Sequence, residues 1–296
     1  MAQIQTKTLD TTFINDVYLD KTSIEAQVNK ILARNLVYEK ENYKKWLIKA
    51  VSVIDLTTLS GDDTRSNVTR LCIKAAKPLS QLGIDIQTAA VCVYPNRVSD
   101  AFDTITRMGQ NGINIASVAT GFPSGLYPLK TRVQEIEYAV SKGANEIDVV
   151  LDRSLVLTGQ WGTLYKEVLE MKQACGDAHL KVILGVGELG TYENVYCASM
   201  VSMLAGADFI KTSTGKEAVN ATLPVGLVMC RAIRTFYQMT GIKVGLKPAG
   251  GIKTARDAVN WLVLIQTELG SDWLTPKLFR IGASSLLAVI EKELKG

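Results

Sequence analysis

The sequence predicts an α/β protein that folds as a (β/α)8 TIM barrel with an N-terminal helical extension. The chain has 296 residues, and about 250 residues are typical of a single barrel of this kind. Eight short runs rich in Val, Ile, Leu and Ala recur with little polar alternation, as expected of parallel strands covered on both faces. Because most of these runs precede a helical pattern, we expect a closed barrel, although a doubly wound open sheet has the same alternation.

The expected elements begin with the extension at residues 1–49, which packs on the barrel at residues 50–296 to form a single domain. Two apolar groupings in the extension indicate two helices: Ile24, Val28, Ile31 and Leu32, and then Tyr43, Trp46 and Leu47. The eight expected strands are 51–55, 87–94, 114–119, 146–151, 181–186, 208–213, 243–248 and 278–283.

Two of the helices between these strands have clear end signals. Thr131 followed by Gln134 predicts a capping box, and Gly143 predicts the end of that helix. A second helix is predicted to begin at Pro224 and to end at Gly241.

Composition excludes several classes of function. The 33 basic and 29 acidic residues are mixed along the chain and give a net charge of +4, so nucleic-acid binding is not expected, whereas an anionic small molecule suits the mild positive field. Five scattered cysteines indicate reduced thiols and no disulfide framework. The polar N-terminus and the lack of long apolar runs predict neither secretion nor a membrane span. We therefore expect a cytoplasmic location, and a homo-oligomer would fit these properties.

Three charged residues lie within otherwise apolar strands. They are Asp148 in EIDVV, Lys211 in DFIK and Lys247 in VGLK. The active site of a barrel lies at the C-terminal ends of its strands, and strands six and seven are neighbours, so the two lysines should lie close together. Burial and a second cation both lower a lysine pKa. A neutral lysine is a nucleophile toward carbonyl groups, and Asp148 with a water molecule could transfer the protons.

Each of these residues also has a structural explanation. Most lysines are exposed, and Lys181, at the start of the fifth expected strand, is predicted to be solvated. Lys211 and Lys247 differ because each follows two apolar residues and precedes a turn. Asp148 could instead be a buried structural acid with satisfied hydrogen bonds.

Residues after the last two strands predict a phosphate site. Gly250 and Gly251 follow strand seven, and Ser284 and Ser285 follow strand eight. Separately, the glycines could form a tight turn and Ser284 could cap a helix. Together they occupy the position where barrels commonly bind phosphate with backbone amides and helix N-termini.

Other patterns are less informative. GVGELG, with Gly185, Gly187 and Gly190, matches the dinucleotide fingerprint, but it lies in the fifth repeat instead of the first. His179 is the only histidine and should lie on the non-catalytic face, which argues against a histidine-rich zinc site. Cys92 is interpreted as a buried structural thiol.

Eight motifs together resemble the deoxyribose-phosphate aldolase family over about residues 50–290. They are IDLTTL (54–59), AAVCVYP (89–95), VATGFPSG (118–125), EIDVV (146–150), GELG (187–190), DFIKTSTGK (208–216), KPAGGI (247–252) and RIGASS (280–285). The longer N-terminal segment and SLVLTGQW (154–161) resemble the eukaryotic branch of that family.

The resemblance implies a metal-free and cofactor-free class I aldolase. Its reaction is the reversible cleavage of 2-deoxy-D-ribose 5-phosphate to D-glyceraldehyde 3-phosphate and acetaldehyde. It implies that Lys211 forms the Schiff base, that Asp148 relays protons and that Lys247 perturbs Lys211. The implied substrate-binding residues are Asp55 and Thr57 at the sugar end, and Lys216, Gly250, Gly251, Ser284 and Ser285 at the phosphate.

Two features differ from the family pattern. Val186 stands where relatives usually have threonine, and the chain ends in EKELKG without the tyrosine that assists proton transfer in many relatives. The role of that tyrosine is then either lost or filled by water, and both differences concern the rate more than the type of reaction. The competing interpretations are an NAD(P)-dependent oxidoreductase and a sugar-phosphate-binding barrel without activity.

Overall fold

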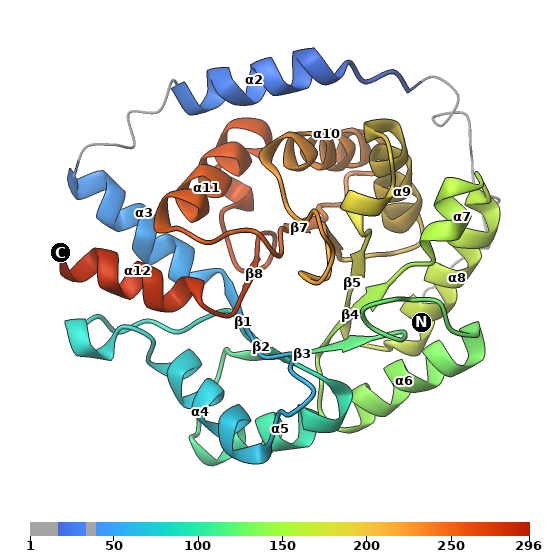
Figure 1. Ribbon diagram of the computed structural model, residues 1–296. Coiled ribbons are helices and arrows are strands. Elements are labelled where there is room, and N and C mark those ends of the chain that lie inside the picture. The colour runs from blue at the N-terminus through green and yellow to red at the C-terminus, as the bar shows by residue number, and fades with distance from the viewer. Residues whose placement is uncertain (1–16, 34–39) are drawn as a thin grey trace.

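The computed structural model describes residues 17–33 and 40–296, and shows eight parallel strands in a ring inside an outer layer of helices (Figure 1). The hydrogen-bonded order is β7-β6-β5-β4-β3-β2-β1-β8. Isolated bridges from Leu246 to Phe279 and from Ala249 to Gly282 join the two ends of the sheet. The sheet is therefore a barrel, and the open-sheet alternative is excluded. The strands are β1 (Ile54–Thr57), β2 (Ala90–Val93), β3 (Asn114–Ala119), β4 (Glu146–Val150), β5 (His179–Ile183), β6 (Phe209–Lys211), β7 (Gly245–Lys247) and β8 (Ile281–Ala283).

The helices of the barrel are amphipathic or largely buried, and they cover the outer face of the strands. They are α4 (Arg65–Ala76), α5 (Val98–Arg107), α6 (Leu129–Ser141), α7 (Arg153–Leu157), α8 (Trp161–Ala174), α9 (Tyr192–Leu204), α10 (Leu223–Thr240), α11 (Ala255–Leu269) and α12 (Leu286–Lys295). Short 3₁₀ turns are η2 (Ser80–Leu82), η3 (Pro95–Arg97), η4 (Val186–Glu188) and η5 (Ser271–Trp273).

The two helices predicted in the N-terminal extension are present. Helix α2 (Lys21–Ala33) buries Ile24, Val28 and Ile31 against α10 and α11, and α3 (Lys40–Ser52) packs on α11 and α12 (Figure 1). The apolar spacing predicted these helices because their buried residues recur on one helical face. The rest of the predicted extension, residues 1–16 and 34–39, lies outside the described residues.

Most observed strands are shorter than predicted, and two of the boundary differences matter for the site. Val51, expected in the first strand, belongs to α3, and β1 begins only at Ile54. β5 begins at His179, two residues before the expected start at Lys181. A short apolar run has the same composition at the end of a buried helix and in a buried strand, so its pattern does not fix the boundary.

The predicted ends of α10 agree with the structure to within one residue, and so does the predicted end of α6, where Gly143 with φ of 103° follows the C-cap; the predicted start of α6 was wrong. In α10 the Thr222 side chain accepts a hydrogen bond from the Val225 N–H, and Gly241 is the left-handed C-cap with φ of 73°. Helix α6 begins at Leu129 after Pro128, and the Thr131 hydroxyl donates to the Pro128 carbonyl (2.8 Å). The expected capping box at Thr131 is therefore absent, because the helix begins before that residue.

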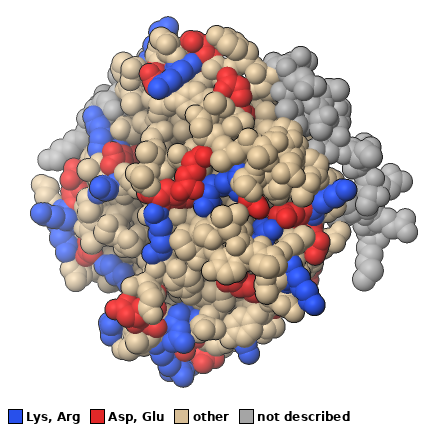
Figure 2. Space-filling view, turned by 45° about the vertical axis from the view of Figure 1, so that its right-hand side comes forward, with Lys and Arg blue, Asp and Glu red and all other residues tan. Residues whose placement is uncertain are grey.

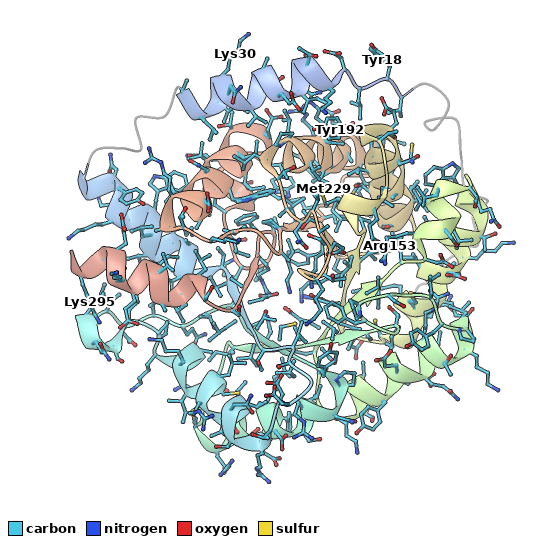
Figure 3. All side chains as sticks on the ribbon, viewed as in Figure 1. Tyr18, Lys30, Arg153, Tyr192, Met229 and Lys295 are labelled. Atoms are coloured by element: carbon cyan, nitrogen blue, oxygen red, sulfur yellow. The ribbon has the colours of Figure 1, made fainter. Side chains whose placement is uncertain are left out.

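Charges of both signs cover the surface, and side chains fill the interior. Basic and acidic side chains are interspersed on the visible face, without a large patch of one sign (Figure 2). Side chains fill the centre of the ring of strands (Figure 3). No helix in the described ranges is long and apolar enough to cross a membrane.

Candidate active site

A cavity of about 460 Å³ opens at the C-terminal ends of the strands. Its lining comes from the segments that follow β1, β6, β7 and β8, with Lys211 contributed by β6 itself. The lining residues are Thr57, Thr58, Leu59, Ser60, Lys211, Thr214, Gly215, Lys216, Ala249, Gly250, Gly251, Ile252, Lys253, Gly282, Ala283, Ser284 and Ser285.

The charge of this cavity is entirely positive. Lys211, Lys216 and Lys253 line it, and none of its lining residues is a carboxylate. Backbone amides of adjacent glycines and two serine hydroxyls add hydrogen-bond donors at the same place. Such a cavity attracts a small anion.

Lys211 is the last residue of β6 and faces Lys247, the last residue of β7, in the strand register. Between their side chains lies the carboxylate of Asp148 from β4, whose Oδ2 atom is 2.7 Å from the Nζ atoms of both lysines. All three side chains are buried, but only Lys211 also lines the cavity. The three residues singled out as charged positions in apolar strands therefore form one hydrogen-bonded group.

This group belongs to a larger set of buried charges, here called the interior charge layer. The layer consists of three carboxylates and four basic side chains inside the barrel: Asp55, Glu146, Asp148, Lys181, Lys211, Lys247 and Arg280. If all seven were ionised the layer would carry one excess positive charge. A neutral Lys211 removes that excess.

The pKa values in the layer shift in different directions. Burial lowers the pKa of Lys211, and the nearby Lys247 ammonium acts in the same direction against the opposing attraction of Asp148. Burial also disfavours charge on Lys247, but the carboxylates of Asp148 and Asp55 outweigh it and raise the pKa of Lys247. For Asp148, burial opposes ionisation, yet the ammonium groups of Lys181, Lys211 and Lys247 hold its pKa well below the usual range. Lys211 is thus the lysine of this group that loses its proton most readily.

The prediction that Lys181 is solvated was wrong. Lys181 is the third residue of β5, is fully buried and bonds to Glu146 (2.5 Å) and Asp148 (3.0 Å). Because β5 begins at His179, Lys181 lies inside the strand instead of at its exposed first position, and its side chain reaches the buried carboxylates in the barrel. His179 itself opens the strand and is exposed.

Asp55 and Thr57 lie at different depths on β1. Asp55 is fully buried in the interior charge layer, 2.5 Å from Lys247 and 2.6 Å from Arg280, and does not line the cavity. Thr57 lines the cavity, and its hydroxyl donates to the Asp55 carbonyl. The late start of β1 explains the difference, because it places Asp55 within the strand instead of at its end.

The residues expected at the phosphate lie together on the rim of the cavity. Gly250 and Gly251 have φ of 77° and 81°, and a Cβ atom on Gly250 would lie 2.7 Å from the Asn220 side chain. Glycine is therefore required at Gly250 by conformation and by space. Ser284 and Ser285 directly precede α12, and the Lys216 ammonium bonds to the Leu59 carbonyl (3.0 Å) across the opening.

Comparison with known proteins identifies the family. The family model described as DeoC/LacD family aldolase matches residues 49–292. The chain belongs to this aldolase family. It is 58% identical over 294 residues to deoxyribose-phosphate aldolase of Mus musculus, with 97% of this chain and 92% of that protein covered. It is 55% identical to deoxyribose-phosphate aldolase of Homo sapiens over the same shares of the two chains.

Solved structures agree with the aldolase fold. The aldolase QR15 has a TM-score of 0.67 at 26% identity, covering 83% of this chain and 96% of that one. The deoxyribose phosphate aldolase from Aeropyrum pernix has a TM-score of 0.66 at 24% identity, covering 87% of this chain and 99% of that one. The latter likeness supports the barrel fold alone.

Sequence reasoning missed several residues of the candidate site. Arg280 and Glu146 in the interior charge layer were passed over, although both are charged residues next to or inside apolar strands. Lys253, Thr58 and Thr214 line the cavity, and each lies within a few residues of the end of a strand that was predicted. The rule that barrel sites are built from the segments after the strands could have found these three residues.

The remaining singled-out positions lie near the site without lining the cavity. Cys92 is buried inside the barrel, where burial raises the pKa of its thiol. Val186, which replaces the family's threonine, is buried at the start of η4. Gly185 and Gly187 are parts of this turn after β5, so the dinucleotide-like motif does not open a long helix.

Proposed function

We propose that this chain is a class I deoxyribose-phosphate aldolase. It cleaves 2-deoxy-D-ribose 5-phosphate reversibly to D-glyceraldehyde 3-phosphate and acetaldehyde through a Schiff base on Lys211. The observation that carries the proposal is the buried Lys211 amine, with a lowered pKa, at a cavity lined by basic groups. The curated relatives named above, at 55% and 58% identity, support the choice of substrate.

The chemistry follows from the position of Lys211. Its neutral amine attacks the C1 aldehyde of the open-chain sugar, and the carbinolamine loses water to give an iminium ion. Removal of the C3 hydroxyl proton then breaks the C2–C3 bond, because the iminium accepts the electron pair and becomes an enamine. Protonation at C2 and hydrolysis release acetaldehyde. Since the iminium is the electron sink, this reaction requires neither a metal nor an organic cofactor.

Asp148 is proposed to transfer protons in these steps, and Lys247 is proposed to keep Lys211 from carrying a positive charge. Asp148 Oδ2 is within hydrogen-bond distance of the Lys211 amine and, through a water molecule, could exchange protons with the bound intermediate. Lys247 stays an ammonium ion and thereby disfavours a second positive charge on Lys211.

The phosphate is proposed to bind at the rim of the cavity. Gly250 and Gly251 offer backbone amides, Ser284 and Ser285 offer hydroxyls at the start of α12, and Lys216 offers an ammonium group. Thr57 is proposed to contact the sugar. The role of Asp55 at the sugar end stays a prediction, and its place in the interior charge layer favours an indirect contribution.

The experiment that tests this function is reductive trapping. Borohydride added with acetaldehyde should fix one ethyl group on Lys211, and peptide mass spectrometry would locate it. Labelling of a different residue, or no labelling at all, would contradict the mechanism. Activity should also persist in EDTA, and zinc-reversible inhibition by the chelator would point to a metal-dependent aldolase.

Three further expectations accompany the proposal. We propose that residues 1–49 and 50–296 form one folding unit, which the packing of α2 and α3 on the barrel helices supports. The five free, buried thiols support action in the cytoplasm. We also propose that the chain self-associates into a homo-oligomer, and light scattering would measure its mass directly.

A further inference from the structure

Lys181 lies directly below the proposed catalytic group and has no access to the substrate. It pairs with Asp148 in the register of β5 and β4. Its side chain is fully buried and absent from the lining of the cavity. Its Nζ atom is 2.5 Å from Glu146 Oε2, 3.0 Å from Asp148 Oδ1 and 3.8 Å from Asp55 Oδ2. Lys181 therefore acts on the reaction, if at all, through its neighbours.

The two oxygen atoms of Asp148 have different partners. Oδ1 accepts from Lys181, whereas Oδ2 accepts from both Lys211 and Lys247. We propose that Lys181 is a positioning residue for the proton relay: it holds Oδ1 and so keeps Oδ2 directed at the Schiff-base lysine. This inference rests on the proposed function and concerns how its relay group is held.

The support for Lys181 extends across the barrel. Arg280, which directly precedes β8, donates to both oxygens of Glu146 (2.6 and 3.1 Å), and Glu146 in turn accepts from Lys181. A rigid chain of charged hydrogen bonds thus runs from Arg280 through Glu146 and Lys181 to Asp148. Charge-assisted bonds of this kind are stronger than neutral ones. Without Lys181 the Asp148 carboxylate would lose its bond at Oδ1 and would be held only through Oδ2, by Lys211 and Lys247.

Loss of Lys181 should slow proton transfer by Asp148 more than it changes the amount of Schiff base present at equilibrium. With acetaldehyde alone, the iminium ion on Lys211 loses a methyl proton to Asp148 through water, forming a neutral enamine. In D2O the enamine regains a deuteron, and hydrolysis releases deuterated acetaldehyde. The rate of this exchange depends on the position of Asp148 Oδ2, because misplacement of a catalytic group by about 1 Å can lower a rate on the order of a hundredfold.

The test compares wild type with Lys181→Met, which keeps a long unbranched side chain without charge. Two quantities are measured: the ethyl groups trapped on Lys211 by borohydride after full equilibration with acetaldehyde, and the deuterium exchange rate. We expect nearly full trapping and exchange per labelled site reduced roughly tenfold or more. Lys181→Arg, which keeps the cation, should restore much of the exchange. An unchanged exchange rate per labelled site in Lys181→Met would overturn the proposal, as would a loss of trapping and exchange in equal proportion.

Two further variants complete the design. If circular dichroism shows that Lys181→Met does not fold, Glu146→Gln weakens the support of Lys181 without removing any lysine. It should lower exchange per labelled site severalfold, and an unchanged rate there would equally overturn the proposal. Lys243→Met is the matched control, because Lys243 pairs with Asp272 outside the barrel interior and should leave both measurements unchanged. Wild type that fails to label at Lys211 would refute the proposed function itself, whereas a labelled wild type with an unaffected Lys181→Met refutes only this inference.

Discussion

Lys211 and Lys247 face one another and share one oxygen of Asp148, yet their pKa values shift in opposite directions. The difference lies in the number of carboxylates. Lys247 has both Asp148 and Asp55 (2.5 Å) as partners, whereas Lys211 has Asp148 alone. Two close carboxylates outweigh burial at Lys247, and one does not outweigh it at Lys211. The same residue type therefore gives a nucleophile at one strand end and a permanent cation at the next.

Replacing Lys247 with leucine should make Lys211 harder to deprotonate. The substitution removes a neighbouring positive charge, so the pKa of Lys211 rises and less of the neutral amine is present at pH 7. We expect activity at pH 7 to fall on the order of a hundredfold, with part of it recovered as pH rises. The pH profile of kcat/KM measures this.

The reference for that profile is Lys211→Leu, which should be inactive at every pH because the nucleophile is gone. Two flat and equally low profiles would mean that Lys247 has a direct chemical or a structural role. Activity of Lys247→Leu close to wild type would mean that the second lysine does not tune the first.

At the scale of residues, the sequence predicted the grouping of Lys211, Asp148 and Lys247 because charge inside an apolar strand is unusual. It did not predict the partners of Lys181 and Asp55. Both residues lie near the start of a strand whose first residue was misplaced by two or three positions. A boundary error of this size changes how deep a strand residue lies in the barrel, so a position predicted at the exposed end of a strand becomes a buried one.

At the scale of elements, the cavity is built by segments that leave β1, β6, β7 and β8 on the same side of the barrel. The segment after β6 is held by Glu217, whose carboxylate accepts bonds from the Thr214 amide (3.0 Å) and hydroxyl (2.7 Å). The close approach of Asn220 to Gly250 packs this segment against the segment after β7. The proposed phosphate donors are therefore held by neighbouring segments as well as by their own strands.

A negative charge at this rim should weaken phosphate binding specifically. In Ser284→Asp the new carboxylate repels the phosphate group, so KM for deoxyribose 5-phosphate should rise at least tenfold, since 1.4 kcal/mol of repulsion corresponds to about a factor of ten. Unphosphorylated deoxyribose should be affected much less. Steady-state kinetics on both substrates measures the difference.

A matched control is Ser271→Asp, because Ser271 is exposed in η5, outside the cavity. It should leave both KM values unchanged. Equal losses on the two substrates in Ser284→Asp would show that Ser284 does not face the phosphate.

The ends of helices were predictable only where one local signal, such as a capping residue, had no competing signal nearby. Pro224 and Gly241 lie at the two ends of α10 as expected, because the preference of proline for the first turn and of glycine for the left-handed cap are local effects. At α6 the proline before the helix sets an earlier start than the pattern at Thr131 indicated. Two competing local signals cannot be ranked without the tertiary packing.

At the scale of the whole molecule, closure of the barrel was the feature that alternation of strands and helices left open. It depends on contacts between residues far apart in the chain, such as the pairing of β1 with β8 and the bridge from Leu246 to Phe279. No local pattern reports such pairings. The family motifs nevertheless predicted the correct fold, because they come from strand ends all around the ring.

The interior charge layer should make stability depend on acid. The carboxyl pKa of Asp55 is lowered, because the cations of Lys247, Arg280 and Lys181 outweigh the effect of burial, and the pKa of Asp148 is lowered for a similar reason. A lowered carboxyl pKa contributes stability that is fully present above the unfolded value near 3.8 and is lost as pH falls toward the folded value. The free energy of unfolding should therefore decline below about pH 4.

Urea denaturation of wild type and Asp55→Asn at pH 7, 4 and 3 measures this dependence. The variant should be less stable at pH 7 by about 3 kcal/mol, a typical result of leaving buried charges without a partner. Its stability should also change less between pH 4 and pH 3. Parallel acid dependence of the two proteins would show that Asp55 does not contribute in this way.

Because the interior charge layer is buried and the phosphate site is exposed, salt should affect substrate binding and the pH dependence of catalysis differently. Lys216 and Lys253 on the rim are exposed, so dissolved ions screen their attraction for phosphate, largely so beyond a Debye length of about 8 Å at 0.15 M salt. Lys247 and Asp148 are buried, where counterions do not reach. Raising sodium chloride from 0.05 to 0.5 M should therefore raise KM for the phosphorylated sugar severalfold while the pH at which kcat is half-maximal stays nearly constant. In this barrel the salt concentration of the solution governs capture of the substrate, and the protein's own buried ions govern what happens to it afterwards.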